Sequence, residues 1–183
     1  MKLKTEEDIL ELIKRDKWMI SVLKIVKELH LSDWWVGAGF VRNKVWDYLH
    51  GYKKRTPLND LDIIFFDKNK NRLYETRLQN RLKKKYPKIN WSIKNQARMH
   101  LKNGNEPYSS SLDGLARWTE TPTCIGVKLN ESDNLVLLAP HGIEDLISLK
   151  VRIGPLLKNK KLYKQRIKEK NWNKTWPKLK IFK

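Results

Sequence analysis

The chain has 183 residues, which is enough for one domain with a hydrophobic core, or for one domain with an appendage. Its hydrophobic content of 40% and its eight Trp favour a folded protein over a disordered one. The one cysteine, Cys124, excludes an internal disulfide framework, the charged first residues do not resemble a signal peptide, and no apolar run is long enough to span a membrane. We therefore expect a cytoplasmic protein with no membrane partner.

The formal net charge of +19 is concentrated near the C-terminal end. Residues 151–183 carry twelve Lys and Arg but only one acidic residue, Glu169. Such a positive segment attracts phosphates, so RNA or another nucleic acid is the first partner to consider, with nucleotides and acidic membrane surfaces as alternatives. Aromatic residues lie among the basic ones: Tyr163, Trp172, Trp176 and Phe182. They either stack on bases or form an apolar strap on the domain.

Apolar periodicity predicts helices and strands that alternate at first and become sheet-rich later. In chain order, the expected elements are helices at 6–13 and 18–29, a buried strand at 34–36, a helix from the Gly37–Gly39 turn to Gly51, a strand at 61–66, a basic helix at 73–86, a strand at 89–94, helices at 95–101 and 111–118, a hairpin of strands 123–129 and 135–138, and helices at 143–151 and 160–170. This order predicts an α/β (α+β) fold with a small mixed sheet flanked by helices. We expect one domain at residues 1–151 and a basic, aromatic-containing C-terminal extension at residues 152–183.

Two aspartates at the start of the predicted strand at 61–66 are the most informative feature. Asp60 and Asp62 are one residue apart, so their side chains share one face of the strand, while Leu61 and Ile63 share the other. Two carboxylates at a rigid strand end can hold Mg²⁺ or Mn²⁺. In isolation such a pair is often only a solvated turn.

A turn of small residues, Gly37-Ala38-Gly39, precedes the helix that ends near Gly51. Backbone amides at such a helix start can approach a phosphate group closely. Arg42 lies on the first turn of that helix and can reach the same phosphates. Together with the aspartate pair, this order of pieces indicates a site where metal ions bridge a triphosphate.

These pieces resemble the nucleotidyltransferase superfamily of DNA polymerase β, the CCA-adding enzymes and the poly(A) polymerases. Three segments carry the resemblance: Ala38-Gly39-Phe40-Val41-Arg42-Asn43, Leu49-His50-Gly51 and Asp60-Leu61-Asp62-Ile63. More closely, the chain to about Val151 resembles a bacterial family of nucleotidyltransferase-like proteins. Further segments match that family: Val45-Trp46-Asp47, Thr56-Pro57, Asn95-Gln96-Ala97-Arg98-Met99-His100, Glu120-Thr121-x-Thr123 and His141-Gly142-x-Glu144-Asp145-Leu146.

The resemblance implies a metal-dependent nucleotidyltransferase, which moves a nucleoside monophosphate from a nucleoside triphosphate to an acceptor hydroxyl. It implies that Asp60 and Asp62 are catalytic and hold Mg²⁺ (or Mn²⁺). It also implies a set of nucleotide-binding residues: Gly37, Ala38, Gly39, Arg42 and Asn43.

The chain departs from the superfamily pattern at three positions. Ala38 stands where the superfamily has its first glycine, and Asn43 where it has an aspartate after the arginine. Ser92 lies on the strand that usually carries a third carboxylate. The metal site therefore rests on two carboxylates, or it borrows Glu120 from another strand.

Two more polar segments could line the same cleft: Asn95, Gln96, Arg98 and His100 after one predicted strand, and Glu120 and Thr121 before another. As an alternative, Asn95 caps the following helix and its neighbours are surface or structural groups. Asp47 is expected to pair with a nearby Arg or Lys, and Cys124 to be a core residue within a strand.

Two other functions stay open. A catalytically degenerate nucleic-acid-binding protein would bind RNA through residues 151–183, in a manner that depends on salt but not on divalent metal. A glycosyltransferase also uses an Asp-x-Asp motif to hold a metal-bound nucleotide sugar. It would need a longer α/β domain before the motif than about sixty residues provide.

Overall fold

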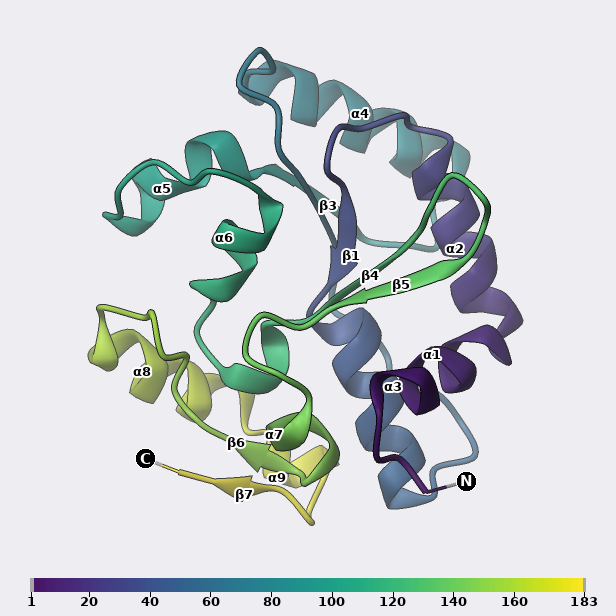
Figure 1. Ribbon diagram of the computed structural model, residues 1–183, viewed down its shortest axis with the longest axis vertical. Coiled ribbons are helices and arrows are strands. Elements are labelled where there is room, and N and C mark those ends of the chain that lie inside the picture. The colour runs from purple at the N-terminus through teal and green to yellow at the C-terminus, as the bar shows by residue number, and fades with distance from the viewer. Residues whose placement is uncertain (1, 183) are drawn as a thin grey trace.

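The computed structural model describes residues 2–182, with a five-stranded mixed sheet at its centre (Figure 1). The strands are β1 (Trp35–Gly37), β2 (Leu61–Phe65), β3 (Trp91–Asn95), β4 (Gly126–Leu129) and β5 (Leu135–Leu138), in the order β3-β2-β1-β4-β5. β1 is antiparallel to β2 and β4, β2 is parallel to β3, and β4 and β5 form an antiparallel hairpin. The expected mixed α/β fold is confirmed.

Helices flank this sheet on both faces (Figure 1). They are α1 (Glu6–Lys14), α2 (Lys17–Lys27), α3 (Gly39–His50), α4 (Arg72–Lys85), α5 (Gln96–Asn103), α6 (Ser111–Ala116), α7 (Glu144–Ile147), α8 (Lys160–Lys170) and α9 (Trp172–Thr175). A short 3-10 helix, η1 (Thr121–Thr123), precedes β4, and β6 (Lys150–Val151) pairs in parallel with β7 (Lys180–Ile181). Within residues 2–182, no helix is long and apolar enough to cross a membrane.

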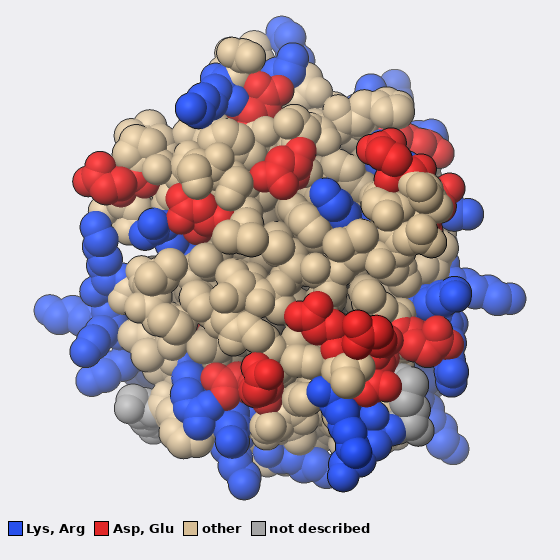
Figure 2. Space-filling model, in the orientation of Figure 1, with Lys and Arg blue, Asp and Glu red and all other residues tan. Residues whose placement is uncertain are grey.

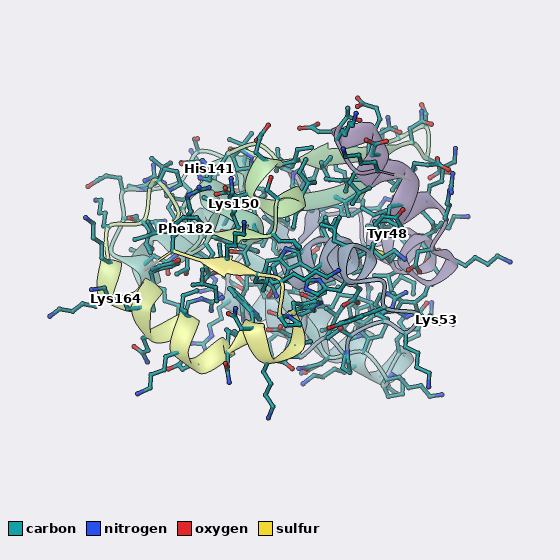
Figure 3. All side chains as sticks on the ribbon, turned by 90° about the horizontal axis from the view of Figure 1, so that it is seen from below. Tyr48, Lys53, His141, Lys150, Lys164 and Phe182 are labelled. Carbon is teal, nitrogen blue, oxygen red and sulfur yellow. The ribbon has the colours of Figure 1, made fainter. Side chains whose placement is uncertain are left out.

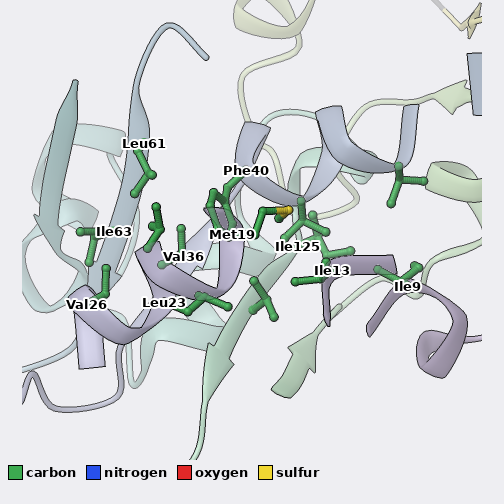
Figure 4. Packing of buried hydrophobic residues seen from close by; sticks show 14 of the residues in the cluster. Ile9, Ile13, Met19, Leu23, Val26, Val36, Phe40, Leu61, Ile63 and Ile125 are labelled. Carbon is green, nitrogen blue, oxygen red and sulfur yellow. The ribbon is translucent and has the colours of Figure 1, made fainter. Parts of the chain in front are cut away.

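The two faces of the sheet differ. The main core covers one face, where α1, α2 and α3 bring apolar side chains onto the strands (Figure 4): Ile9, Ile13, Met19, Leu23, Val26 and Phe40 against Val36, Leu61, Ile63 and Ile125. The helices that supply this layer begin with side-chain caps. Thr5 and Asp8 form a capping box at α1, and Asp16 caps α2. On the other face Trp35, Ile64 and Leu115 form a smaller cluster, which leaves part of that face uncovered.

The predicted helix at 143–151 is wrong in its extent. Only α7 is helical there, because Leu149 takes a positive φ of 56° that ends the helix. The chain then enters β6, which pairs with β7 from the C-terminal end. Such a pairing is invisible to local periodicity.

The predicted strand at 123–129 is also too long. Pro122 lies within η1, so Thr123 and Cys124 belong to a tight turn, and β4 begins only at Gly126. Cys124 is buried as expected, but in that turn and not in a strand. Its hydroxyl neighbour Thr123 bonds back to the carbonyl of Glu120, which closes the turn.

The C-terminal segment adds buried aromatic side chains to the main core. Trp172 and Trp176 pack edge-on against Trp46 of α3, with ring centroids 5.5 and 5.1 Å away. Trp176 Nε1 also donates to Asp47 Oδ1 over 2.8 Å. Because Tyr163 is buried too, the aromatic residues of this segment act as an apolar strap, with Phe182 the exposed exception.

Asp47 is structural, but not as predicted. It accepts hydrogen bonds from the backbone and hydroxyl of Thr56 and from Trp176, whereas a Lys or Arg partner was expected. Each carboxylate oxygen can accept more than one hydrogen bond, so three neutral donors can satisfy the buried Asp47 carboxylate without a cation.

Charge is unevenly spread over the surface. In the view of Figure 2, basic side chains lie mainly along the rim of the molecule, and acidic ones gather over α1. The first turn of α1 contains Glu6, Glu7 and Asp8, which suit the positive end of the helix dipole.

Candidate active site

A cavity of about 690 Å³ opens on the less covered face of the sheet. Ala38, Gly39 and Arg42 line it from the start of α3, and Asp60 and Asp62 from β2 and the residue before it. Residues of α8 and α9 line it as well. The cavity thus brings together parts of the chain that are more than a hundred positions apart.

The aspartate pair occupies the predicted geometry. Leu61 and Ile63 are buried in the main core, whereas Asp60 and Asp62 line the cavity on the other face. Asp62 lies opposite Ser92 in the parallel register of β2 and β3, and the Ser92 hydroxyl bonds to its side chain. Burial, followed by the negative charge of Asp60, raises the pKa of Asp62 to about 6. Two carboxylates that repel each other in a partly dry site favour a bound cation between them.

The turn before α3 has a strained residue. Ala38 has φ 50° and ψ −120°, a conformation that costs an alanine more than a glycine. Ala38 and Gly39 both line the cavity. Gly37 does not, and its role is packing, because a Cβ there would lie 3.1 Å from the carbonyl oxygen of Ile125.

Arg42 is a buried cation in the cavity wall. Its side chain lies over the rings of Trp46 and Trp172, with Cζ 5.1 and 4.5 Å from their centroids. It donates from Nη2 to Asn43 Oδ1 over 2.9 Å, while its Nε has no hydrogen-bond partner among the described residues. Burial lowers the pKa of Arg42 to about 10, despite the nearby Glu120 carboxylate. A buried guanidinium with an unused donor is suited to a phosphate ligand.

Glu120 lies in the same wall but is already engaged. It is fully buried, and its carboxylate accepts from Arg166 Nε over 2.8 Å and from Thr123 Oγ1 over 2.8 Å. Among the described residues, no group of three or more His, Cys, Asp or Glu could hold a metal ion. A cation held here would rest on Asp60 and Asp62, which both line the cavity and whose oxygen donors and negative charge fit Mg²⁺.

The other predicted cleft residues divide. Gln96 lines the cavity, whereas Asn95, Arg98, His100 and Thr121 are not among the lining residues. Asn95 is fully buried, caps α5 and donates to the carbonyls of Asp67 and Lys70, as the structural alternative predicted.

The remaining three have partners of their own. Arg98 forms an ion pair with the buried Glu75, His100 packs edge-on against Tyr108, and Thr121 donates to Asp145. Sequence reasoning missed Arg166, because only its basic, helical context was visible and not its distant partner Glu120.

The raised pKa of Asp62 predicts an unusual pH dependence of stability. Between its ordinary value of 3.8 and about 6, the folded protein keeps a proton that the unfolded chain has lost, so the free energy of unfolding falls as pH rises through this window. About two pH units correspond to roughly 2–3 kcal/mol. We expect Asp62→Asn, which stays neutral, to be more stable than the wild type at pH 7 by that amount and equal to it near pH 4. Urea unfolding at both pH values measures this, and a difference that is independent of pH contradicts it.

Comparisons with known proteins give a family match and a structural match that each cover most of the chain. A family model described as nucleotidyltransferase matches residues 24–181. An NMR structure described as revealing a CCA-adding enzyme head domain is 33% identical, with a TM-score of 0.88, and the match covers 98% of this chain and 97% of that one. A comparison with curated proteins finds no significant match.

Two longer enzymes share the fold only. The Thermotoga maritima CCA-adding enzyme complexed with tRNA is 18% identical with a TM-score of 0.58, and a CCA-adding enzyme in complex with CTP is 15% identical with a TM-score of 0.55. The matches cover 98% and 100% of this chain, which spans 43% and 44% of those enzymes.

Proposed function

The chain belongs to the nucleotidyltransferase family, and we propose on that basis that it transfers a nucleoside monophosphate from a nucleoside triphosphate to an acceptor hydroxyl. The observation that carries this proposal is the shared cavity, where the Asp60 and Asp62 carboxylates face the start of α3 and its buried Arg42. Acids for a metal and a cation for phosphate are the two requirements of phosphoryl-type transfer.

Each group has a part in the proposed reaction. Asp60 and Asp62 would hold Mg²⁺ (or Mn²⁺), which when bound supplies charge neutralisation at the triphosphate. The backbone at Ala38 and Gly39 would approach the phosphates at the helix start, and Arg42 would donate to them. The acceptor hydroxyl attacks the α-phosphorus, the bond to the bridging oxygen of the β-phosphate breaks, and pyrophosphate leaves while the hydroxyl proton passes to a base or water.

An anionic acceptor, such as the end of an RNA strand, fits the rest of the cavity. Lys102, Lys158 and Lys170 line it, and its acidic lining residues are Asp60, Asp62 and Glu120. One structure of similar fold is described as complexed with tRNA, which supports RNA as the acceptor class. The competing proposal is a binding-only protein, favoured because the described residues include no group of three or more His, Cys, Asp or Glu that could hold a metal ion.

Calorimetry and gel shifts separate these two functions. The protein is titrated with each of the four nucleoside triphosphates in the presence of Mg²⁺. We expect a binding signal for at least one of them, and we expect EDTA to abolish that signal. The binding-only alternative instead predicts RNA binding that weakens steeply as the salt concentration rises and that EDTA does not change. No signal for any triphosphate contradicts the proposed transferase.

A further inference from the structure

Arg166 lines the cavity from an element that lies far from the nucleotide-binding segment in the sequence. It belongs to a stripe on α8, Leu162, Arg166 and Lys170, whose spacing of four residues places the three side chains on one helical face, and all three line the cavity. Tyr163 and Ile167 anchor the same helix in the core. The position of Arg166 is thus fixed by packing.

The Arg166 guanidinium has spare hydrogen-bonding capacity. It donates from Nε to Glu120 Oε1 over 2.8 Å and, less directly, from Nη2 to Oε2 over 3.5 Å. A guanidinium has five N–H donors, so this contact with one edge leaves donors free, and the side chain is 33% exposed. Glu120, which Thr123 also holds, therefore fixes the orientation of Arg166 without using all of its donors.

The charges in this wall do not balance. Arg42 and Arg166 are close enough to repel, since Arg166 contributes to the lowered pKa of Arg42 after burial itself. Among residues 2–182, Glu120 is the carboxylate hydrogen-bonded to this pair, through Arg166, while Asp60 and Asp62 attract both guanidiniums without a hydrogen bond. If Asp60 and Asp62 hold a metal ion, as proposed, Glu120 alone offsets the two guanidiniums, and this wall then carries one net positive charge.

We propose that Arg166 binds the terminal phosphates of the nucleoside triphosphate, beside Arg42, with Glu120 as the residue that positions it. This inference rests on the proposed function and adds a residue from the C-terminal segment to its site. A triphosphate has several charged phosphate groups, so it can bind both guanidiniums at once. A nucleoside monophosphate has one phosphate group and would bind only one of them. Arg166 therefore selects triphosphates over monophosphates.

Isothermal titration calorimetry with three probes, each with Mg²⁺, tests this selection: inorganic tripolyphosphate, a nucleoside triphosphate and the corresponding monophosphate. Arg166→Ala loses charge-assisted hydrogen bonds to phosphate. We expect it to lower the affinity for tripolyphosphate and for the nucleoside triphosphate by about ten- to hundredfold, and the affinity for the monophosphate by less than about twofold. The matched control is Lys164→Ala, which removes one charge from the outer side of the same helix (Figure 3) and leaves all three affinities unchanged.

A second variant guards against misfolding. Arg166→Ala leaves Glu120 buried without its cation, so Arg166→Ala combined with Glu120→Gln removes both charges and is expected to show the same loss. Unchanged affinity for tripolyphosphate and triphosphate in both variants overturns the inference and leaves the proposed function standing. Tighter binding of Mg²⁺ and triphosphate by Arg166→Ala also overturns it, because Glu120 would then be a metal ligand that Arg166 blocks.

The wild type separates the two proposals. Binding of tripolyphosphate that depends on Arg166, without binding of any nucleoside triphosphate, supports the phosphate role of Arg166 and overturns the proposed function. A wild type that binds neither probe overturns both.

Discussion

Asp62→Asn is expected to reduce the proposed nucleotidyl transfer by about a thousandfold or more, because it removes one of the two carboxylates that we propose to hold the metal. The amide keeps the size of the side chain and its contact with Ser92, but it brings no negative charge. Asp60→Asn should have a similar effect. With Glu120 bonded to Arg166, the described residues that line the cavity offer no third free carboxylate to replace it.

The measurement is transfer of label from each nucleoside triphosphate to the components of a cell extract, with Mg²⁺ or Mn²⁺. The matched control is Asp67→Asn, a carboxylate just beyond the other end of β2 that accepts from the backbone of Asn69 and does not line the cavity. It should leave the rate unchanged. Asp62→Asn that keeps more than about a tenth of the wild-type rate contradicts the assignment of this residue as a metal ligand.

The expected gain in stability of Asp62→Asn sharpens this experiment. A variant that is more stable at pH 7 and yet inactive has lost function without unfolding. Higher stability together with lost activity is typical of substitutions at active-site residues, because such residues serve catalysis at a cost in stability. The same burial that raises the pKa of Asp62 makes the site attract a cation.

Local sequence signals predict one side of the cavity. The alternation around Asp60 and Asp62, and the small residues before Arg42, are local patterns that a strand and a helix start convert directly into geometry. The capping role of Asn95 was likewise open to prediction, since its side chain accepts from the amide of Ala97 two residues further on. Its bonds to the carbonyls of Asp67 and Lys70, 28 and 25 positions away, were not.

The other side of the cavity could not be predicted in this way. The bond between Arg166 and Glu120 joins residues 46 positions apart, and the pairing of β6 with β7 joins residues 30 positions apart, so no periodicity encodes them. The basic composition of α8 hides Arg166, which lines the cavity, among surface lysines. Burial, which composition cannot assign, distinguishes Arg166 from Lys164.

Residues 152–183 were expected to form an extension, and we propose that residues 152–182 fold as part of the domain. Trp176 is the clearest test, because it is buried, contacts Trp46 and donates to Asp47. Trp176→Ala should lower the free energy of unfolding by about 3–5 kcal/mol, through lost burial and the cavity that remains.

Trp176→Phe separates packing from hydrogen bonding in the same experiment. It keeps an aromatic ring against Trp46 and loses the Nε1 donor, so it should cost about 1–3 kcal/mol, since Asp47 retains its bonds from Thr56. Phe182→Ala, at an exposed ring near the same end, should change stability by less than about 0.5 kcal/mol. Urea unfolding followed by Trp fluorescence and by circular dichroism measures all three. If Trp176→Ala leaves the midpoint unchanged, or if the two signals then give separate transitions, the extension folds independently of the sheet.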